Sequence, residues 1–205
     1  MAERGKKQTM TGLAASLSTL PAAKRRAALE VSAALAGVSL RVSRDFVEAA
    51  PIAAEILSTD EIRAWGELGR RIAMGKAESG SKFFEAGVAH LADLPKQARE
   101  YLFKICTRQL VLSSSISLET FQLAPQLATD INDDEILTEL LRLGVEIANR
   151  SAKHSSEFLL KTGPVAAAFD AFGDQKRETA VTYLELAGHF ANRTGGMTAD
   201  LWTNL

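Results

Sequence analysis

The chain has 205 residues, of which 46% are hydrophobic and 24% are charged, and its formal net charge is −1. This composition is ordinary for a globular protein, and the near-neutral charge argues against a bulk electrostatic partner such as nucleic acid or an anionic membrane. A single cysteine cannot form an internal disulfide, and no apolar run is long enough to cross a bilayer. We therefore expect a cytoplasmic protein without a transmembrane helix.

Residues 1–20 are predicted to form a flexible N-terminal tail. Basic residues precede a mildly apolar stretch there, but Ser and Thr dilute it too much for the core of a signal peptide. Pro21 suits the first position of a helix. Residues 21–205 are predicted to form a single helical-repeat domain.

One pattern recurs along this domain. Trp65, Leu68, Gly69, Ile72 and Ala73 fall on one face of a helix, and the same order of large, aliphatic, small, apolar and small residues returns four times. The marker residues of the five copies are Leu35, Ile72, Gln109, Ile147 and Phe190, separated by 37, 37, 38 and 43 residues. The other four copies are Ala28/Val31/Ser32/Leu35/Ala36, Leu102/Ile105/Cys106/Gln109/Leu110, Leu140/Leu143/Gly144/Ile147/Ala148 and Tyr183/Leu186/Ala187/Phe190/Ala191.

A second segment follows each of the first four copies and contains an apolar pair. The pairs are Phe46-Val47, Phe83-Phe84, Thr120-Phe121 and Leu159-Leu160, and three of these segments also contain a proline, Pro51, Pro125 or Pro164. Proline inside a helix removes a backbone hydrogen bond, so each is expected to kink or restart its helix. Glycine inside a helix costs about 1 kcal/mol relative to alanine, so Gly69 and Gly144 predict sites where helices pack closely.

The period predicts an all-α fold, a right-handed α-solenoid of about five αα-hairpin repeats with a period of about 37–40 residues. An irregular helical bundle is the alternative. Capping signals support the boundaries: they are the run 58–61, Pro95, the serines of 113–117, the acidic run 130–134, Gly173-Asp174 and Gly195-Gly196. Because Leu201-Trp202 align with the apolar pairs close to the last residue, we expect this chain to be truncated from a longer protein.

No group of residues suggests catalysis or metal binding. His90, His154 and His189 have no partner at ligand spacing, and Cys106 occupies the small-residue position, where packing explains it. The acidic run 130–134 lacks the glycine and the closing glutamate of a calcium loop, and phosphate-binding and nucleophile motifs are absent. We predict no catalytic residue, no metal site, no cofactor and no enzymatic activity.

Two columns of residues lie four positions apart on the first helix of each repeat, and so share one exposed face. They read Glu30/Ala34, Glu67/Arg71, Lys104/Arg108, Arg142/Glu146 and Glu185/His189. The middle of this face is basic and its ends are acidic. It is either an ordinary solvated surface or a partner-binding face, with Glu67, Arg71, Lys104, Arg108, Arg142 and Glu146 as the candidate residues.

Two families share parts of this pattern. The motif at Trp65, Leu68, Gly69 and Ile72 is similar to the first helix of a tetratricopeptide repeat, but the period here exceeds 34 residues. The whole unit resembles more closely the helical repeats that precede the von Willebrand A domain in proteins of the NorD/CbbO type. Trp65/Gly69/Ile72/Ala73/Phe83/Phe84 and Gly144/Ile147/Ala148/Gly163/Pro164 carry that resemblance over roughly residues 24–205.

This resemblance implies an adaptor that works with a MoxR-type AAA+ ATPase to activate a client enzyme. The metal-binding motif of the A domain is absent from these residues, so no metal site is carried over. Our leading hypothesis is a non-enzymatic scaffold that binds another protein. The alternatives are a nucleic-acid-binding repeat and a small-molecule pocket lined by Trp65, Phe83 or Tyr101.

Overall fold

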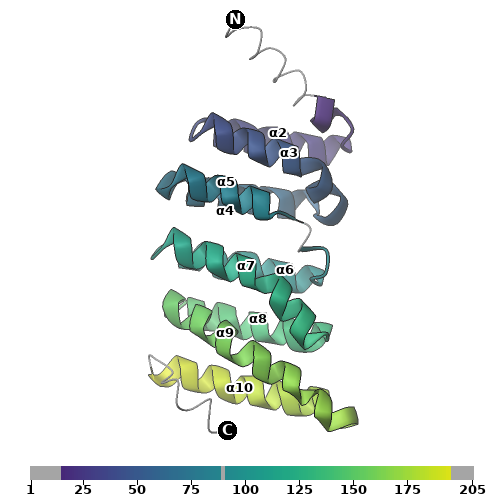
Figure 1. Cartoon of the computed structure of the whole chain (residues 1–205), viewed down its shortest axis with the longest axis vertical. Helices are drawn as coiled ribbons and strands as arrows, with labels where there is room; N and C mark the ends of the chain where they lie inside the picture. The colour runs from purple at the N-terminus through teal and green to yellow at the C-terminus, as the bar shows by residue number, and fades with distance from the viewer. Residues whose placement is uncertain (1–14, 89–90, 195–205) are drawn as a thin grey trace, which may run out of the picture. The chain divides into compact units, whose positions relative to one another are not determined.

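The computed structural model describes residues 15–88 and 91–194, without the side chains of 166, 167, 170–172 and 192–194. Every regular element within these ranges is a helix, so the predicted all-α class is confirmed (Figure 1). The chain divides into two compact units, residues 1–92 and 93–205. We describe each unit by itself, and the prediction of one domain over 21–205 stays a prediction.

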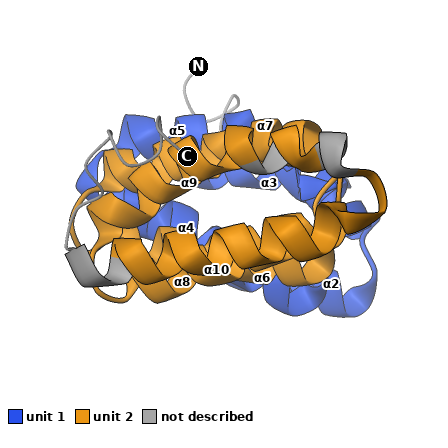
Figure 2. Ribbon diagram, turned by 90° about the horizontal axis from the view of Figure 1, so that it is seen from below, with its two compact units in different colours: residues 1–92 blue, residues 93–205 orange. Residues whose placement is uncertain are grey.

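Unit 1 contains two helical hairpins. The first is α2 (Ala22–Ala36) with α3 (Leu40–Ile56), and the second is α4 (Thr59–Gly75) with α5 (Ala77–Ala86). The first helices α2 and α4 pack on each other, and so do the second helices α3 and α5, which gives the two layers seen in Figure 2.

Unit 2 repeats this arrangement. It contains α6 (Lys96–Gln109), α7 (Ser114–Ile131), α8 (Asp134–Ala148), α9 (Ala152–Ala168), the 3₁₀ helix η2 (Phe169–Gln175) and α10 (Lys176–Thr194). The first helix α8 packs on both α6 and α10, while the second helices α7 and α9 pack together (Figure 2).

The helix boundaries follow the predicted caps. Pro21 and Pro95 immediately precede α2 and α6, as expected. Ser58 forms a capping box: its side chain accepts from the Glu61 N–H at 3.3 Å, and the Glu61 carboxylate accepts from the Ser58 N–H at 2.8 Å. Asp133 caps α8 by accepting from the N–H groups of Glu135 and Ile136, both at 3.1 Å. The predicted turn at Gly195-Gly196 lies outside the described residues.

The core of unit 1 is an aromatic cluster that joins the two hairpins. Trp65 of α4 meets the ring of Phe84 edge-on at a centroid distance of 4.9 Å. Phe46 of α3 lies 5.2 Å from Trp65 and 5.3 Å from Phe84. All three side chains, with Phe83, are fully buried, so the predicted burial of the Trp65 repeat is confirmed.

The small-residue positions are sites of close packing, as predicted. A Cβ atom added at Gly69 would lie 2.1 Å from the Phe84 ring of the same hairpin, and one added at Gly144 would lie 2.9 Å from Ile105 and 3.3 Å from Leu159. In unit 2 the Ser117 hydroxyl donates to the carbonyl of Cys106 at 3.0 Å. Gly69 and Cys106 therefore face the second helix of their own hairpin, while Gly144 packs between α9 of its own hairpin and α6 of the preceding one.

A second recurring contact joins neighbouring hairpins. An aliphatic residue of one first helix packs on a glycine of the next: Val31 on Gly66 in unit 1, and Leu143 on Gly188 in unit 2. A Cβ atom at Gly66 would lie 2.2 Å from Val31 Cγ1, and one at Gly188 would lie 3.0 Å from Leu143 Cδ2. We name these contacts glycine seams, and the Ile105–Gly144 contact belongs to the same class.

Several predicted details are wrong. The buried pair of α9 is Phe158-Leu159, and Leu160 is 53% exposed. The observed pair lies 38 residues after Thr120-Phe121, as Ile147 lies 38 after Gln109, whereas the predicted pair was placed one residue too far along the chain. In α10, Ala187 and Ala191 are buried but Leu186 is 57% exposed. Leu186 occupies the seam position of Val31 and Leu143, and no further hairpin follows it within the described residues.

Helices α3, α7 and α9 continue through Pro51, Pro125 and Pro164, so none of them restarts at its proline, and a kink at each proline stays a prediction. In the predicted tail, residues 15–18 are helical, and Leu17 and Leu20 are buried. The rest of that tail, residues 1–14, lies outside the described residues.

Candidate partner-binding surface

The candidate face is exposed within each unit, as predicted. In unit 1, Glu67 is exposed and Arg71 is half-buried on α4. In unit 2, α6 presents Lys104 and Arg108, both exposed. Helix α8 presents Arg142, which is half-buried, and Glu146, which is exposed.

Ion pairs neutralise part of this face. The Arg70 guanidinium donates to both carboxylate oxygens of Glu67, at 2.7 and 2.8 Å, and these hydrogen bonds are the main reason that the pKa of Glu67 is lowered. Arg142 donates to Glu139 at 2.8 and 2.6 Å, and it also pairs with Glu146. The hydrogen bond with Glu139 is the main cause of the raised pKa of Arg142. The positive charge of Arg142 is therefore neutralised, and Arg142 does not add free positive charge to the predicted basic middle of the candidate face.

Three of the predicted cations form no close ion pair, although Arg71 is near enough to Glu67 to contribute, alongside Arg70, to the lowering of its pKa. Arg71, Lys104 and Arg108 make no ion pair with any residue in the described part of the chain. The Lys104 ammonium lies 5.2 Å from the centroid of the Tyr101 ring, a cation–π contact that leaves its charge uncompensated. The free positive charge of unit 2's candidate face thus lies on α6.

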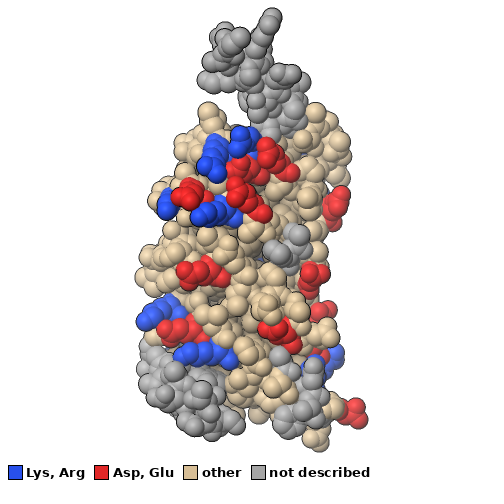
Figure 3. All heavy atoms as spheres, in the orientation of Figure 1, with Lys and Arg blue, Asp and Glu red and all other residues tan. Residues whose placement is uncertain are grey.

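Most other cations of the described chain pair with a carboxylate, although Lys24, Arg25 and Lys161 do not. Figure 3 shows basic and acidic side chains intermingled over unit 1, where Arg44 pairs with Glu48 at 3.6 Å and Lys82 with Glu78 at 3.1 Å. Over α7 the same view is mostly uncharged. What distinguishes α6 is that two exposed unpaired cations, Lys104 and Arg108, lie four residues apart on one helix.

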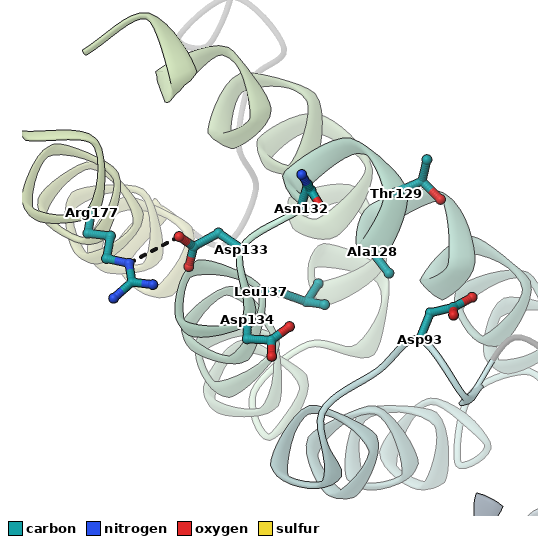
Figure 4. Close-up of a pocket in the computed structure, with 8 residues that line it drawn as sticks. All are labelled: Asp93, Ala128, Thr129, Asn132, Asp133, Asp134, Leu137 and Arg177. Atoms are coloured by element: carbon teal, nitrogen blue, oxygen red, sulfur yellow. Dashed lines mark hydrogen bonds and ion pairs between the residues drawn. The ribbon is translucent and has the colours of Figure 1, made fainter. Parts of the chain in front are cut away.

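A cavity of about 510 Å³ opens in unit 2 beside the start of α8 (Figure 4). Its polar rim includes Asp93, Asp133, Asp134 and Arg177, with Leu137 among its apolar residues. Arg177 of α10 donates to Asp133 at 3.1 Å and pairs with Glu135 at 2.9 Å. The Asp133 carboxylate is thus committed to capping α8 and tethering α10, and the cavity contains none of the predicted site residues.

The residues proposed for a small-molecule pocket do not form one. Trp65 and Phe83 are fully buried in the aromatic cluster, while Tyr101 belongs to the other unit and is half-buried on α6. A fully packed side chain cannot line an accessible pocket without rearrangement. That hypothesis is wrong for Trp65 and Phe83.

Cys106 is a packing residue, as its position in the repeat suggested. It is fully buried, and burial raises the pKa of its thiol to about 12, while the interaction with Ser117 acts in the opposite direction. A thiol with so high a pKa is protonated at neutral pH and is a poor nucleophile. Within the described residues no group of His, Cys, Asp and Glu side chains is arranged to hold a metal ion.

A buried polar contact between hairpins escaped the sequence analysis. The side chain of Gln109 is fully buried, and its Nε2 donates to Ser155 Oγ at 3.0 Å and to the Ala152 carbonyl at 3.4 Å. These bonds link α6 to α9. The only signal was a glutamine at the marker position that is apolar in the other copies.

Protein-family models, curated proteins and solved structures give no match to this chain. No helix in the described ranges combines the length and the apolar character that crossing a bilayer requires.

Proposed function

We propose that this chain is a non-enzymatic helical-repeat scaffold, a right-handed α-solenoid of about five hairpins, that binds another protein through its first-helix face. The stacking of first helix on first helix and second helix on second helix inside each unit supports this proposal. So do the glycine seams, because each hairpin then buries its apolar face against its neighbour.

The observation that carries the binding role is the set of unpaired cations at Arg71, Lys104 and Arg108. Exposed guanidinium and ammonium groups of this protein usually find a carboxylate, as Arg142 and Arg177 do. Cations left open on a rigid helical surface are available to a partner, and charge complementarity governs both the specificity and the rate of association.

The most specific form of the proposal is the adaptor role that the NorD/CbbO resemblance implies, in which the partner is a MoxR-type AAA+ ATPase or its client enzyme in the cytoplasm. That form depends on the residues of the resemblance alone, Trp65 to Phe84 and Gly144 to Pro164.

A pull-down from lysate of the source cells tests the scaffold role. The tagged chain is compared with a variant in which Arg71, Lys104, Arg108 and Arg142 are changed to Glu, and recovered proteins are quantified by mass spectrometry. The control changes four other cations, Lys82, Lys96, Lys153 and Lys161, to Glu and thus has the same net charge. Far-UV circular dichroism verifies that both variants fold.

We expect the first variant to lose a specific partner that the control retains. Equal recovery by the two variants would remove the first-helix face from consideration. Recovery of nucleic acid in place of protein, sensitive to salt, would favour the nucleic-acid alternative.

A further inference from the structure

We propose that one side of α6 and the turn after it, formed by Tyr101, Lys104, Arg108, Val111 and Leu112, binds an acidic segment of a protein partner. That segment carries two carboxylates one helical turn apart and apolar side chains beyond them. We call this surface the α6 strip. The inference rests on the proposed scaffold function and names the chemistry of its partner.

The five residues lie along one line. Positions 101, 104 and 108 are three and four residues apart on α6, so they share one side of the helix. The chain makes one further turn beyond α6, in which the Val111 N–H donates to the Arg108 carbonyl at 3.3 Å and the Leu112 N–H to the Gln109 carbonyl at 3.0 Å. The two apolar residues therefore continue the line of the two cations.

Lys104 and Arg108 are open, whereas Arg142 of α8 and Arg177 of α10 are paired; Lys161 of α9 also makes no ion pair within the described chain. Arg142 pairs with Glu139 and Glu146, and Arg177 pairs with Asp133 and Glu135. Lys104 and Arg108 are exposed and have no carboxylate partner in the described chain. Their spacing of four residues corresponds to about 6 Å along the helix, which matches two carboxylates one turn apart on a partner helix.

The turn after α6 does not need apolar residues at positions 111 and 112 in order to form. The side chains of Val111 and Leu112 are 75% and 64% exposed. In the turn between α8 and α9 the Arg150 and Ser151 N–H groups donate to the Ile147 carbonyl at 3.0 and 2.8 Å, as the Leu112 and Ser113 N–H groups donate to the Gln109 carbonyl, both at 3.0 Å. Asn149 and Arg150 there replace the two apolar residues. An equivalent turn thus forms with polar residues, and burying Val111 and Leu112 against a partner would remove apolar surface from water.

A protein segment fits this surface better than a nucleic acid does. On the neighbouring helix α8, Glu139 and Glu146 flank Arg142, so a polyanion that extended from α6 across α8 would meet carboxylates. A phosphate backbone also offers nothing apolar to Val111 and Leu112. A short segment with two acids and an apolar end satisfies both halves of the α6 strip without reaching α8.

The test is a selection from a displayed library of random 16-residue peptides on the full chain, followed by fluorescence anisotropy with the enriched peptides. We expect enriched peptides to contain two Asp or Glu residues three or four positions apart and a Leu, Ile, Phe or Met one turn beyond. The variant K104E/R108E should weaken binding of these peptides at least tenfold. The variant V111S/L112S should weaken it at least threefold and retain its salt dependence.

The matched control is K96E/K161E, which changes the net charge by the same amount as K104E/R108E. Its two residues, on α6 and α9, lie outside the α6 strip, so this variant should bind the peptides as the unchanged chain does. Enriched peptides without acids, or equal affinity for K104E/R108E and the unchanged chain, would overturn the inference while leaving the scaffold role standing. A labelled 20-nucleotide single strand that binds more tightly than every peptide, and loses affinity in K104E/R108E, would also overturn it. If the unchanged chain enriches no peptide and recovers no protein from lysate, the scaffold function fails as well.

Discussion

Replacing Gly69 with alanine tests the packing argument most directly, because helix propensity and packing predict opposite signs. Propensity alone predicts a gain of about 1 kcal/mol for glycine to alanine inside a helix. The added Cβ atom, however, would lie 2.1 Å from the Phe84 ring, which is held between Phe46, Trp65 and Phe83. Overpacking of a rigid core costs about 1–3 kcal/mol. With the cost at the upper end, we expect a net loss of about 2 kcal/mol in the free energy of unfolding.

Urea unfolding followed by circular dichroism at 222 nm measures this difference. The control is G37A at the end of α2, where a Cβ atom would meet only the Ala34 carbonyl oxygen at 3.4 Å, and this substitution should be neutral or slightly stabilising. Combining G69A with Phe84→Leu should cost less than the sum of the two single changes, since the shorter side chain makes room. A G69A chain as stable as the unchanged protein, or more stable, would refute the close-packing account of the repeat.

Three further predictions concern single side chains. Ser58→Ala should lower the free energy of unfolding by about 1 kcal/mol in urea titrations, because the capping box with Glu61 is lost; an unchanged midpoint would show that this cap contributes nothing. Cys106 should resist iodoacetamide at pH 8 in the folded protein and react rapidly in urea, because burial raises the pKa of its thiol to about 12; modification of the folded chain within minutes would contradict its burial. For Asp133, burial raises the pKa, but the hydrogen bonds from the Ile136 N–H and from Arg177 outweigh it and leave the pKa lowered. A lowered carboxyl pKa contributes stability above the unfolded value of about 4 and loses it as the pH falls through the folded value. Between pH 7 and pH 3, the free energy of unfolding should therefore fall less for D133N than for the unchanged chain. Equal decreases would show that this carboxylate does not cause the loss of stability in acid.

The sequence predicted the parts of the fold that depend on one helix or one hairpin. The buried faces of α4 and α8, the caps at Ser58 and Asp133 and the close approach at Gly69 all follow from local spacing, and the structure confirms each. Such features need only helical periodicity and the hydrogen-bonding needs of helix ends.

Contacts between hairpins were not predictable in the same way. The glycine seam of Leu143 with Gly188 and the bonds from Gln109 to Ser155 join residues more than forty positions apart. Aligning equivalent positions of the repeats shows which residues are apolar or small, but it does not show which residue of one hairpin contacts which residue of the next. The pair Phe158-Leu159 of α9, by contrast, follows the same step of 38 residues as the marker residues Gln109 and Ile147, and the prediction of Leu159-Leu160 departed from that step by one residue.

The sequence correctly predicted that the candidate face is accessible to solvent, but it did not predict which of the charged residues on this face are paired. The column pair Arg142/Glu146 already places a carboxylate four positions after Arg142, and Glu139, three positions before it, is a second partner. Pairs three apart are equally close on a helix. Including them would have identified α6, and not α8, as the place where positive charge stays open in unit 2.

The glycine seams are directional, since the aliphatic side chain always belongs to the earlier hairpin and the glycine to the later one. The glycines, however, occupy different positions of the repeat: Gly66 is one residue after Trp65, Gly144 is four after Leu140 and Gly188 is five after Tyr183. A hairpin copied in frame would therefore need a new glycine opposite the aliphatic residue at each added junction, so each seam also fixes which hairpin can follow which.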